Sequence, residues 1–556
     1  MQQVHEIASF TSLIPRAAGT RHPLLAGCAM LVLVGGLVAC DHRKPPSQSV
    51  YKTATRVLRR GLPGEPRTLD PHLADDEFSL QVIRDLYEGL TAEDAAGKIE
   101  PGAAVSWTIN DSGTSYVFHL RPGAKWSNGA PLTAGEFVEG LRRAVDPKTG
   151  SGDAELLAVI RGASDVIAGR KKASELGVTA LDDSSVRIDL EHPAPFVLQV
   201  LSQPIAAPLY DGKPVTSSPS QADRDRGPYD GAYVLADRVP GSFIELSRNP
   251  NYWNSSKVAI DRVRYVNAES ETTELHEYIA GQLDMTSTVP LADLGRITQI
   301  LGKEVQVATT LGTIYLALNL SKPPFAGNHD LREALSIAVD RQLIAEHVMT
   351  GVEPAYAFVA QGAGGYAPPK YDWMSWDRDR QLAYARVLYA RAGYSEKNPI
   401  HLRLYFPSRD AIQRTMIAVA ASWEEHLGVV SELISDEFQV FLGGRKDRSR
   451  WDVAWLRWNA DYDDPSSFLD VLAPASSQND PDYVNPSFSA LIQRATTEPL
   501  PEVRMNDLRN AEQVMLDDYP IIPIYFTRGR RLVKPYLGGA QITPMNRTYS
   551  KNLFWK

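Results

Sequence analysis

Apolar and polar residues alternate in two stretches of the first half of the chain, which predicts two strands there. Residues 116–120 alternate and end at an Arg-Pro-Gly turn signal in residues 121–123. Residues 186–190 alternate in the same way and stop shortly before Pro193. Such short alternating runs, bounded by proline and glycine, are typical of strands that bury one face.

Apolar residues recur at helical spacing in three other places. Residues 133–136 match a capping box, and the helical pattern after it ends at Asp146-Pro147. Asp330 can cap a second helix that runs through Ala338, and a third helix fits residues 378–392. This mixture predicts an α/β protein with several sheets, and it argues against a helical bundle or an all-β barrel.

Length, composition and charge narrow the class of protein. The chain has 556 residues, which suggests about three or four domains. Hydrophobic residues make up 43% and charged residues 22%, which excludes a disordered chain, a collagen and a protein with many membrane spans. The net charge is −9 and there is no long basic run, so we expect no nucleic-acid partner.

Signatures of catalysis and metal binding are missing from the sequence. The two cysteines are Cys28 and Cys40, so the rest of the chain can form no disulfide framework, cysteine–zinc site or cysteine nucleophile. There is no G-x-S-x-G elbow, H-E-x-x-H motif or Walker A sequence. Asp461, Asp463 and Asp464 lack the glycine and distal glutamate of an EF-hand loop. We therefore expect no catalytic residues, no metal and no cofactor.

The first forty residues have the pattern of an export signal. Arg16 and Arg21 precede an almost wholly apolar run over residues 23–39. That run is shorter than the roughly 20 residues of a membrane span and fits the apolar region of a secretory signal. Residues 1–40 are therefore predicted to be a signal peptide.

The end of this signal resembles the bacterial lipobox. Leu-Val-Ala-Cys closes the apolar run at Cys40, which implies that the thiol of Cys40 is lipidated. An ordinary signal peptide that happens to contain cysteine is the alternative. Asp41 then implies retention at the inner membrane, and residues 41–54 are predicted to be a flexible tether.

Six ordered segments of the chain together resemble one family. They are residues 69–72, 85–90, 118–129, 248–253, 322–325 and 459–469. In order and spacing they are similar to the periplasmic oligopeptide-binding proteins of ABC importers, solute-binding family 5. The resemblance extends from about Thr55 to the end of the chain.

This resemblance implies a periplasmic binding protein fold of the cluster C type, a two-lobe flytrap with an extra padding domain. Carried over by the motifs, lobe I takes residues 55–90, 210–311 and 525–556. The padding domain takes residues 91–209, and lobe II takes residues 312–524.

A buried peptide needs partners for its backbone groups and its terminal charges, and pairing it as an extra strand supplies the first of these. Asp461 stands at the position of the family's ammonium-binding aspartate, which the charge of a peptide's N-terminus requires. The alternative is a loop aspartate that caps a turn. Arg457, Trp458 and Asn459 come just before it and are expected to form the strand-pairing edge.

Further site residues also follow from the resemblance. Trp458 and Tyr315 match aromatic residues of the family cleft. Asp75, Asp76 and Glu77 stand at the contact segment of the other lobe, although a solvated acidic loop is an equally simple interpretation.

The chain departs from the family where a peptide's carboxylate would be held. Basic residues are replaced by Met349, Ile412 and Trp455, and Arg457 is the candidate substitute. On a strand Arg457 shares a face with Trp455. Trp451, Trp455 and Trp458 also fall at helical spacing, so a buried helical stripe is the alternative.

Two more departures concern the same cleft. A family glutamate near the ammonium is Ala317 here, and a cysteine pair of some members is Gly312 and Asn459. Together with the missing carboxylate grip, these departures imply that the ligand is a peptide of different length, a modified or murein peptide, or another compound with an ammonium group.

Three functional hypotheses follow. The first is a monomeric, lipid-anchored periplasmic receptor that passes oligopeptides to ABC permease subunits in the inner membrane. The second is a sensor or co-receptor of the same fold without a transport role. The third is a membrane-anchored hydrolase, for which no nucleophile and base stand out.

Overall fold

The computed structural model describes residues 56–212, 227–268, 270–349 and 351–556, all of which belong to the unit Thr55–Lys556. The predicted signal peptide, the tether and Cys40 lie outside the described residues. No described helix combines the length and the apolar character that a membrane crossing requires.

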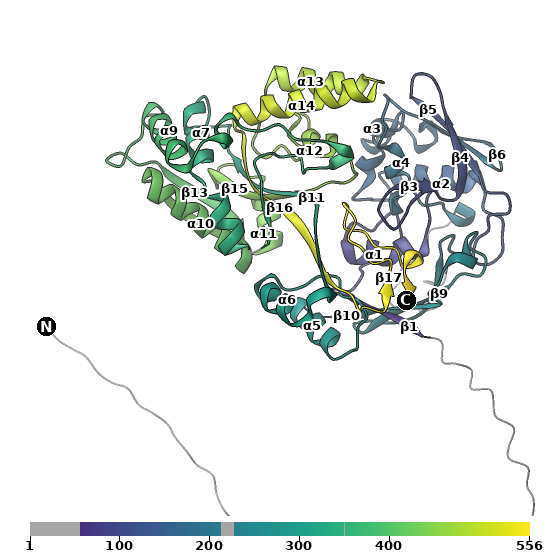
Figure 1. Cartoon of the computed structure of the whole chain (residues 1–556). Helices are drawn as coiled ribbons and strands as arrows, with labels where there is room; N and C mark the ends of the chain where they lie inside the picture. Colours follow the sequence, from purple (N-terminus) through teal and green to yellow (C-terminus); the bar gives the residue numbers. More distant parts are fainter. Residues whose placement is uncertain (1–55, 213–226, 269, 350) are drawn as a thin grey trace, which may run out of the picture. The chain divides into compact units, whose positions relative to one another are not determined.

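A four-stranded sheet opens the described chain (Figure 1). Its strand order is β1 (Val57–Leu62), β10 (Arg262–Asn267), β9 (Phe243–Arg248) and β8 (Tyr233–Val239). β1 and β10 are parallel and the other pairs are antiparallel. Helix α1 (Glu77–Leu86) packs on β8, and α5 (Glu271–Ile279) and α6 (Leu294–Leu301) follow β10.

A second, wholly antiparallel sheet is inserted between α1 and β8. Its order is β4 (Ala104–Ile109), β5 (Ser115–Leu120), β7 (Ser185–Asp189) and β6 (Val178–Asp182). β5 and β7 confirm both predicted strands. Helix α2 (Ala134–Val145) confirms the capping box, since Thr133 N–H donates to Glu136 Oε2 at 2.8 Å. Its apolar side packs on β6 and β7.

The largest sheet has six strands and lies in the second half of the chain. Its order is β12 (Glu353–Pro354), β16 (Ile521–Leu532), β11 (Val305–Leu318), β15 (Val453–Asn459), β13 (His401–Pro407) and β14 (Val430–Asp436). β11 and β16 are the longest strands, and Figure 1 shows both running from this sheet toward α5 and α6. These two strands therefore connect the two halves of the described unit.

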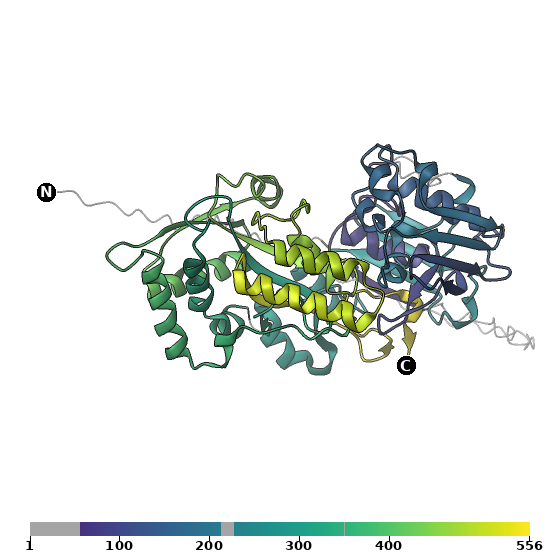
Figure 2. The same cartoon turned by 90° about the horizontal axis from the view of Figure 1, so that it is seen from above.

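Helices cover the six-stranded sheet. They are α7 (His329–Ala338), α8 (Arg341–Leu343), α9 (Arg378–Arg391), α10 (Asp410–Leu427), α11 (Phe438–Gly444), α12 (Ser466–Leu469), α13 (Pro486–Thr497) and α14 (Pro501–Asp518). α13 and α14 lie side by side in Figure 2. α9 confirms the predicted third helix. The predicted cap of the second helix is wrong: Asn328 Oδ1 accepts from Leu331 N–H at 3.3 Å, and Asp330 lies inside the first turn of α7.

Smaller elements complete the described fold. They are α3 (Ala163–Ile167), α4 (Val197–Val200), the pair β2 (Thr91–Glu93) and β3 (Ile99–Pro101), and the pair β17 (Leu537–Gly538) and β18 (Phe554–Trp555). The α/β class predicted from the sequence is confirmed, whereas the predicted domain boundaries stay predictions.

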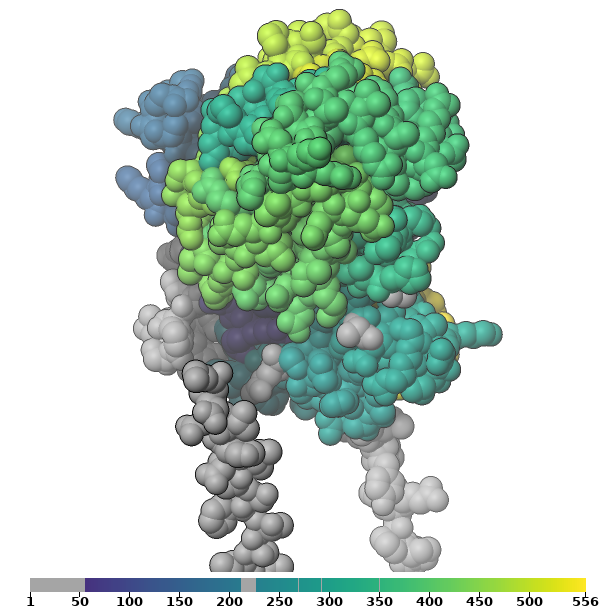
Figure 3. Space-filling view, turned by 90° about the vertical axis from the view of Figure 1, so that its left-hand side faces the viewer, coloured from purple at the N-terminus to yellow at the C-terminus, as the bar shows by residue number. Residues whose placement is uncertain are grey.

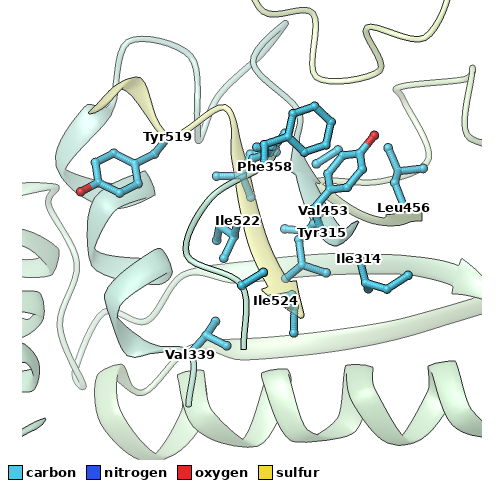
Figure 4. Close-up of a cluster of buried hydrophobic side chains, with 14 of the residues drawn as sticks. Ile314, Tyr315, Val339, Phe358, Val453, Leu456, Tyr519, Ile522 and Ile524 are labelled. Carbon is cyan, nitrogen blue, oxygen red and sulfur yellow. The ribbon is translucent and has the colours of Figure 1, made fainter. Parts of the chain in front are cut away.

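Two large hydrophobic cores match these two halves. One gathers residues of the two four-stranded sheets and their helices, and the other gathers residues of the six-stranded sheet and its helices. Figure 4 shows part of the second core, where Tyr315, Ile522 and Ile524 come from neighbouring strands. Burial of these side chains holds β11, β15 and β16 in a fixed register.

Candidate ligand-binding cavity

A cavity of about 1390 Å³ is lined by residues of both halves of the described unit. One wall comes from residues 75–84 and 152–203, and the other comes from residues 457–508, with a contribution from residues 544–547. Figure 3 shows the green residues around β13 and α11 above the teal residues of α5 and α6, with purple residues of the first segment visible between them. The cavity exceeds the roughly 300–1,000 Å³ of ordinary small-molecule sites.

The end of β15 forms part of this cavity wall. β15 pairs with β11 along its whole length, from Val453 to Asn459. It pairs with β13 only at Val453 and Ala454. Within the described part of the chain, the β13 side of Trp455 to Asn459 therefore has no strand partner. An open strand edge beside a cavity can accept an extended chain through main-chain hydrogen bonds.

Three predicted edge residues, Arg457, Trp458 and Asn459, all line the cavity. Arg457 Nε donates to Asn459 Oδ1 at 3.0 Å, which orients both side chains. Restricted solvent lowers the pKa of Arg457, and the charges of Arg530 and Arg409 act in the same direction. The half-buried Trp458 has a buried Nε1–H without an acceptor among the described residues.

Asp461 also lines the cavity, directly after β15. Its main chain is fixed: Asp461 N–H donates to Ser467 Oγ at 2.8 Å, and Gln203 Nε2 and Arg547 Nη2 donate to its carbonyl at 3.0 and 3.1 Å. Its carboxylate forms no hydrogen bond or ion pair with the described residues. Burial, helped by the charge of Asp153 and opposed by Arg547, raises the pKa of Asp461 to about 6. A cation that binds beside such a carboxylate stabilises its charged form.

The segment around Asp461 touches the opposite wall. The ring of Tyr462 stacks on Phe196 with centroids 4.1 Å apart, and Gln199 Nε2 donates to the carbonyl of Asp463 at 3.2 Å. These contacts place the two walls together beside Asp461.

The three predicted acidic residues of the other wall are all engaged by the protein. Asp76 caps α1 and accepts from Ser79 N–H at 2.8 Å. Asp75 pairs with Arg67, and Glu77 pairs with Arg84 at 3.0 Å. Asp75 and Glu77 line the cavity and Asp76 does not. Their role as ligand contacts stays a prediction.

Tyr315 and Trp455 lie in the core of the six-stranded sheet and not in the cavity lining. The ring of Tyr315 packs edge-on against Phe358 at 5.0 Å (Figure 4). The alternative of a buried helical tryptophan stripe is wrong as to the helix, because Trp455 and Trp458 belong to β15 and point to opposite faces of the sheet. It is right as to burial, because Trp451 and Trp455 belong to the core. Ligand contact by Tyr315 or Trp455 stays a prediction.

Most departures from the family are buried apolar positions, and the exposed Asn459 is the exception. Met349 is 7% and Ile412 is 8% exposed, and both belong to the same core as Trp455. Gly312 pairs with Asn459 across β11 and β15, and Ala317 is fully buried. Met349 and Ile412 therefore offer no positive charge to a peptide's carboxylate. Arg457 is the cavity arginine without an acidic partner among the described residues.

Sequence reasoning missed Asp153 and Asp470, which also line the cavity. No motif surrounds either residue, and only the fold brings them to the same space as Asp461. No group of three or more metal-ligating side chains was found among the described residues.

Comparison with known proteins gives concordant matches. The model of the bacterial extracellular solute-binding proteins, family 5 Middle, matches residues 98–480. The periplasmic oligopeptide-binding protein OppA of Escherichia coli is 32% identical over 541 residues, which cover 96% of this chain and 98% of that protein.

Two solved structures share the fold. The unliganded open form of the periplasmic murein tripeptide-binding protein MppA has a TM-score of 0.79 at 32% identity, covering 90% of this chain and 98% of that one. Haemophilus influenzae OppA in complex with the peptide RPPGFSPFR has a TM-score of 0.76 at 32% identity, covering 90% and 99%. The predicted two-lobe periplasmic binding protein fold is thereby confirmed.

Proposed function

Because the chain belongs to the bacterial extracellular solute-binding proteins of family 5, we propose that it captures oligopeptides in its cavity and delivers them to an ABC importer. The observation that carries this proposal is the open edge of β15, which ends at the unpaired carboxylate of Asp461 in the same cavity. A solute-binding role needs no catalytic group.

The geometry suits a peptide in two ways. Main-chain pairing with Trp455 to Asn459 satisfies backbone groups without reading side chains. The ammonium of the peptide then binds the carboxylate of Asp461, which is otherwise partly buried without a counter-ion. The large cavity leaves room for varied side chains.

Native mass spectrometry of the purified protein, mixed with a pool of two- to nine-residue peptides, tests the proposal. We expect complexes whose added masses match peptides with free N-termini. A protein that retains no peptide and gives no calorimetric signal with any of them contradicts it. Uptake of a bound peptide by cells that carry or lack the chain then separates delivery from a sensor or co-receptor role.

We propose that lipidation at Cys40 holds the protein at the inner membrane, with Asp41 as the retention signal. A Cys40→Ser variant is expected to move to the soluble fraction, because stable anchoring needs acyl chains, each buried CH₂ contributing about 0.8 kcal/mol. Fractionation with metabolic palmitate labelling measures this. A variant that stays wholly with membranes overturns the proposal.

We also expect the two walls of the cavity to close on the ligand, with β11 and β16 as the connecting strands. A bound peptide should make the protein more compact. At one hundred times its Kd it should also raise the free energy of unfolding by about 2.7 kcal/mol. Small-angle scattering and thermal unfolding measure both effects. An unchanged radius of gyration with a proven ligand speaks against closure.

A further inference from the structure

Charged side chains of the cavity divide into those that the protein pairs and those that it leaves unpaired. Three cavity arginines each have an acidic partner, in the pairs Glu77–Arg84, Asp464–Arg504 and Glu93–Arg547. Asp153 and Asp461 form no ion pair or side-chain hydrogen bond with the described residues. Asp470 is likewise without an ion pair, whereas Arg457 is the one cavity arginine without an acidic partner, so unpaired acidic side chains outnumber unpaired basic ones among the described cavity residues.

Asp153 comes from the wall opposite Asp461. It precedes a short 3₁₀ turn, Ala154–Leu157, but its side chain makes no capping hydrogen bond. The neighbouring Gly152 lies close to Asp75: a Cβ added at Gly152 would lie 3.1 Å from the Cβ of Asp75. The backbone therefore runs close to Asp75, just before α1, and the half-buried carboxylate of Asp153 makes no hydrogen bond or ion pair with the described residues.

The charge of Asp153 acts on Asp461. Asp153 is the acidic neighbour whose charge helps to raise the pKa of Asp461. Burial and the nearby Asp75, opposed by the charge of Arg84, raise the pKa of Asp153 itself to about 6. Arg547 opposes the effect at Asp461 but is itself bound to Glu93 at 2.6 Å. A single cation at Asp461 would leave the second carboxylate partly buried and without a direct ion-pair partner.

Building on the proposed function, we propose that Asp153 selects peptides whose first residue is lysine or arginine. Asp461 binds the α-ammonium of that residue, and Asp153 binds its side-chain cation. Both cations belong to one residue, and the flexible stem of lysine or arginine lets the second cation reach the opposite wall. Glu155 and Glu191, which line the same wall, keep its field negative and disfavour an acidic first residue.

Calorimetry with three tripeptides that differ only in the first residue tests this. The first residues are lysine, its uncharged analogue norleucine, and glutamate, each followed by two alanines. For the wild type we expect lysine to bind at least tenfold more tightly than norleucine, and glutamate most weakly. Asp153→Asn should bring lysine and norleucine within about twofold while leaving the norleucine affinity nearly unchanged.

Two further variants make the outcome specific. Asp183→Asn removes the same charge from an exposed residue between β6 and β7, outside the cavity lining, and should keep the lysine preference. Asp461→Asn should weaken the lysine and norleucine peptides alike. Equal wild-type affinities for these two peptides, or a lysine preference that survives in Asp153→Asn, overturn the inference. If neither these peptides nor any peptide of the two- to nine-residue pool binds, the proposed function fails instead.

Discussion

Replacing Asp461 by asparagine is expected to weaken binding of a peptide with a free N-terminus by about two orders of magnitude or more. Asp461 is half-buried, forms no ion pair among the described residues and lines the cavity. Removing one partner of a buried ion pair costs about 3–5 kcal/mol. Each 1.4 kcal/mol corresponds to about tenfold in affinity. Calorimetry with one peptide and both proteins measures the change.

Modified peptides separate the ammonium from the rest of the ligand. N-acetylation should harm binding to the wild type as much as the substitution does, and it should do little further harm to Asp461→Asn. C-terminal amidation should matter much less, because Met349, Ile412 and Trp455 stand where basic residues would hold the carboxylate. A large effect of amidation would assign the carboxylate to Arg457. If acetylation and Asp461→Asn are both harmless, Asp461 is not the anchor.

Asp463 provides a matched control in the same turn. Its Oδ1 accepts from Gly364 N–H at 2.6 Å, and its side chain is not part of the cavity lining. Asp463→Asn keeps this acceptor and removes one charge, so peptide affinity should change by no more than about twofold.

The pH dependence of binding gives the same test from another direction. The pKa of Asp461 is about 6 in the unliganded protein, and a bound ammonium lowers it. Affinity is therefore expected to be highest near neutral pH, to fall as the carboxylate is protonated on approach to pH 6 and below, and to fall again above about pH 8, where the peptide α-ammonium loses its proton. Asp461→Asn should show a much flatter profile with a peptide whose first side chain is uncharged.

The part of the site that the sequence predicted is the part carried by contiguous residues. Arg457 to Asp461 follow one another at the end of a strand, so one motif places them all at the cavity. The tryptophan spacing was ambiguous because intervals of four and three fit a helix as well as a strand. The pairing of β15 with β11, more than a hundred residues away, decided between them.

Residues whose role depends on distant neighbours could not be predicted. The role that we propose for Asp153 depends on Asp461, which comes from the opposite wall. It also depends on the close packing of Gly152 on Asp75. Asp75 and Glu77 carry charge that Arg67 and Arg84 compensate. A linear pattern shows an acidic residue but not whether the fold leaves its charge unpaired.

The largest expected loss of stability follows from Asp464, which ties the turn after β15 to α14. Its two oxygens accept from Arg504 Nη1 and Nη2, both at 2.8 Å, and the two side chains are 7% and 6% exposed. Asp464→Asn keeps the shape but leaves a buried guanidinium without its counter-ion. We expect the free energy of unfolding to fall by about 3–5 kcal/mol, measured by urea denaturation followed by tryptophan fluorescence.

Two comparisons show whether this loss comes from the unpaired charge. Arg391→Ala breaks an ion pair with Asp330 at 3.0 Å in the same half of the chain, but Arg391 is 61% exposed, so the loss should stay below about 1 kcal/mol. Replacing Asp464 and Arg504 together by leucine and methionine removes both charges and should recover much of the stability, because the charge left alone is the main cost. A loss below 1 kcal/mol in Asp464→Asn would mean that water reaches Arg504 and that the turn bearing Asp461 is held mainly by its backbone contacts to Ser467, Gln203 and Arg547.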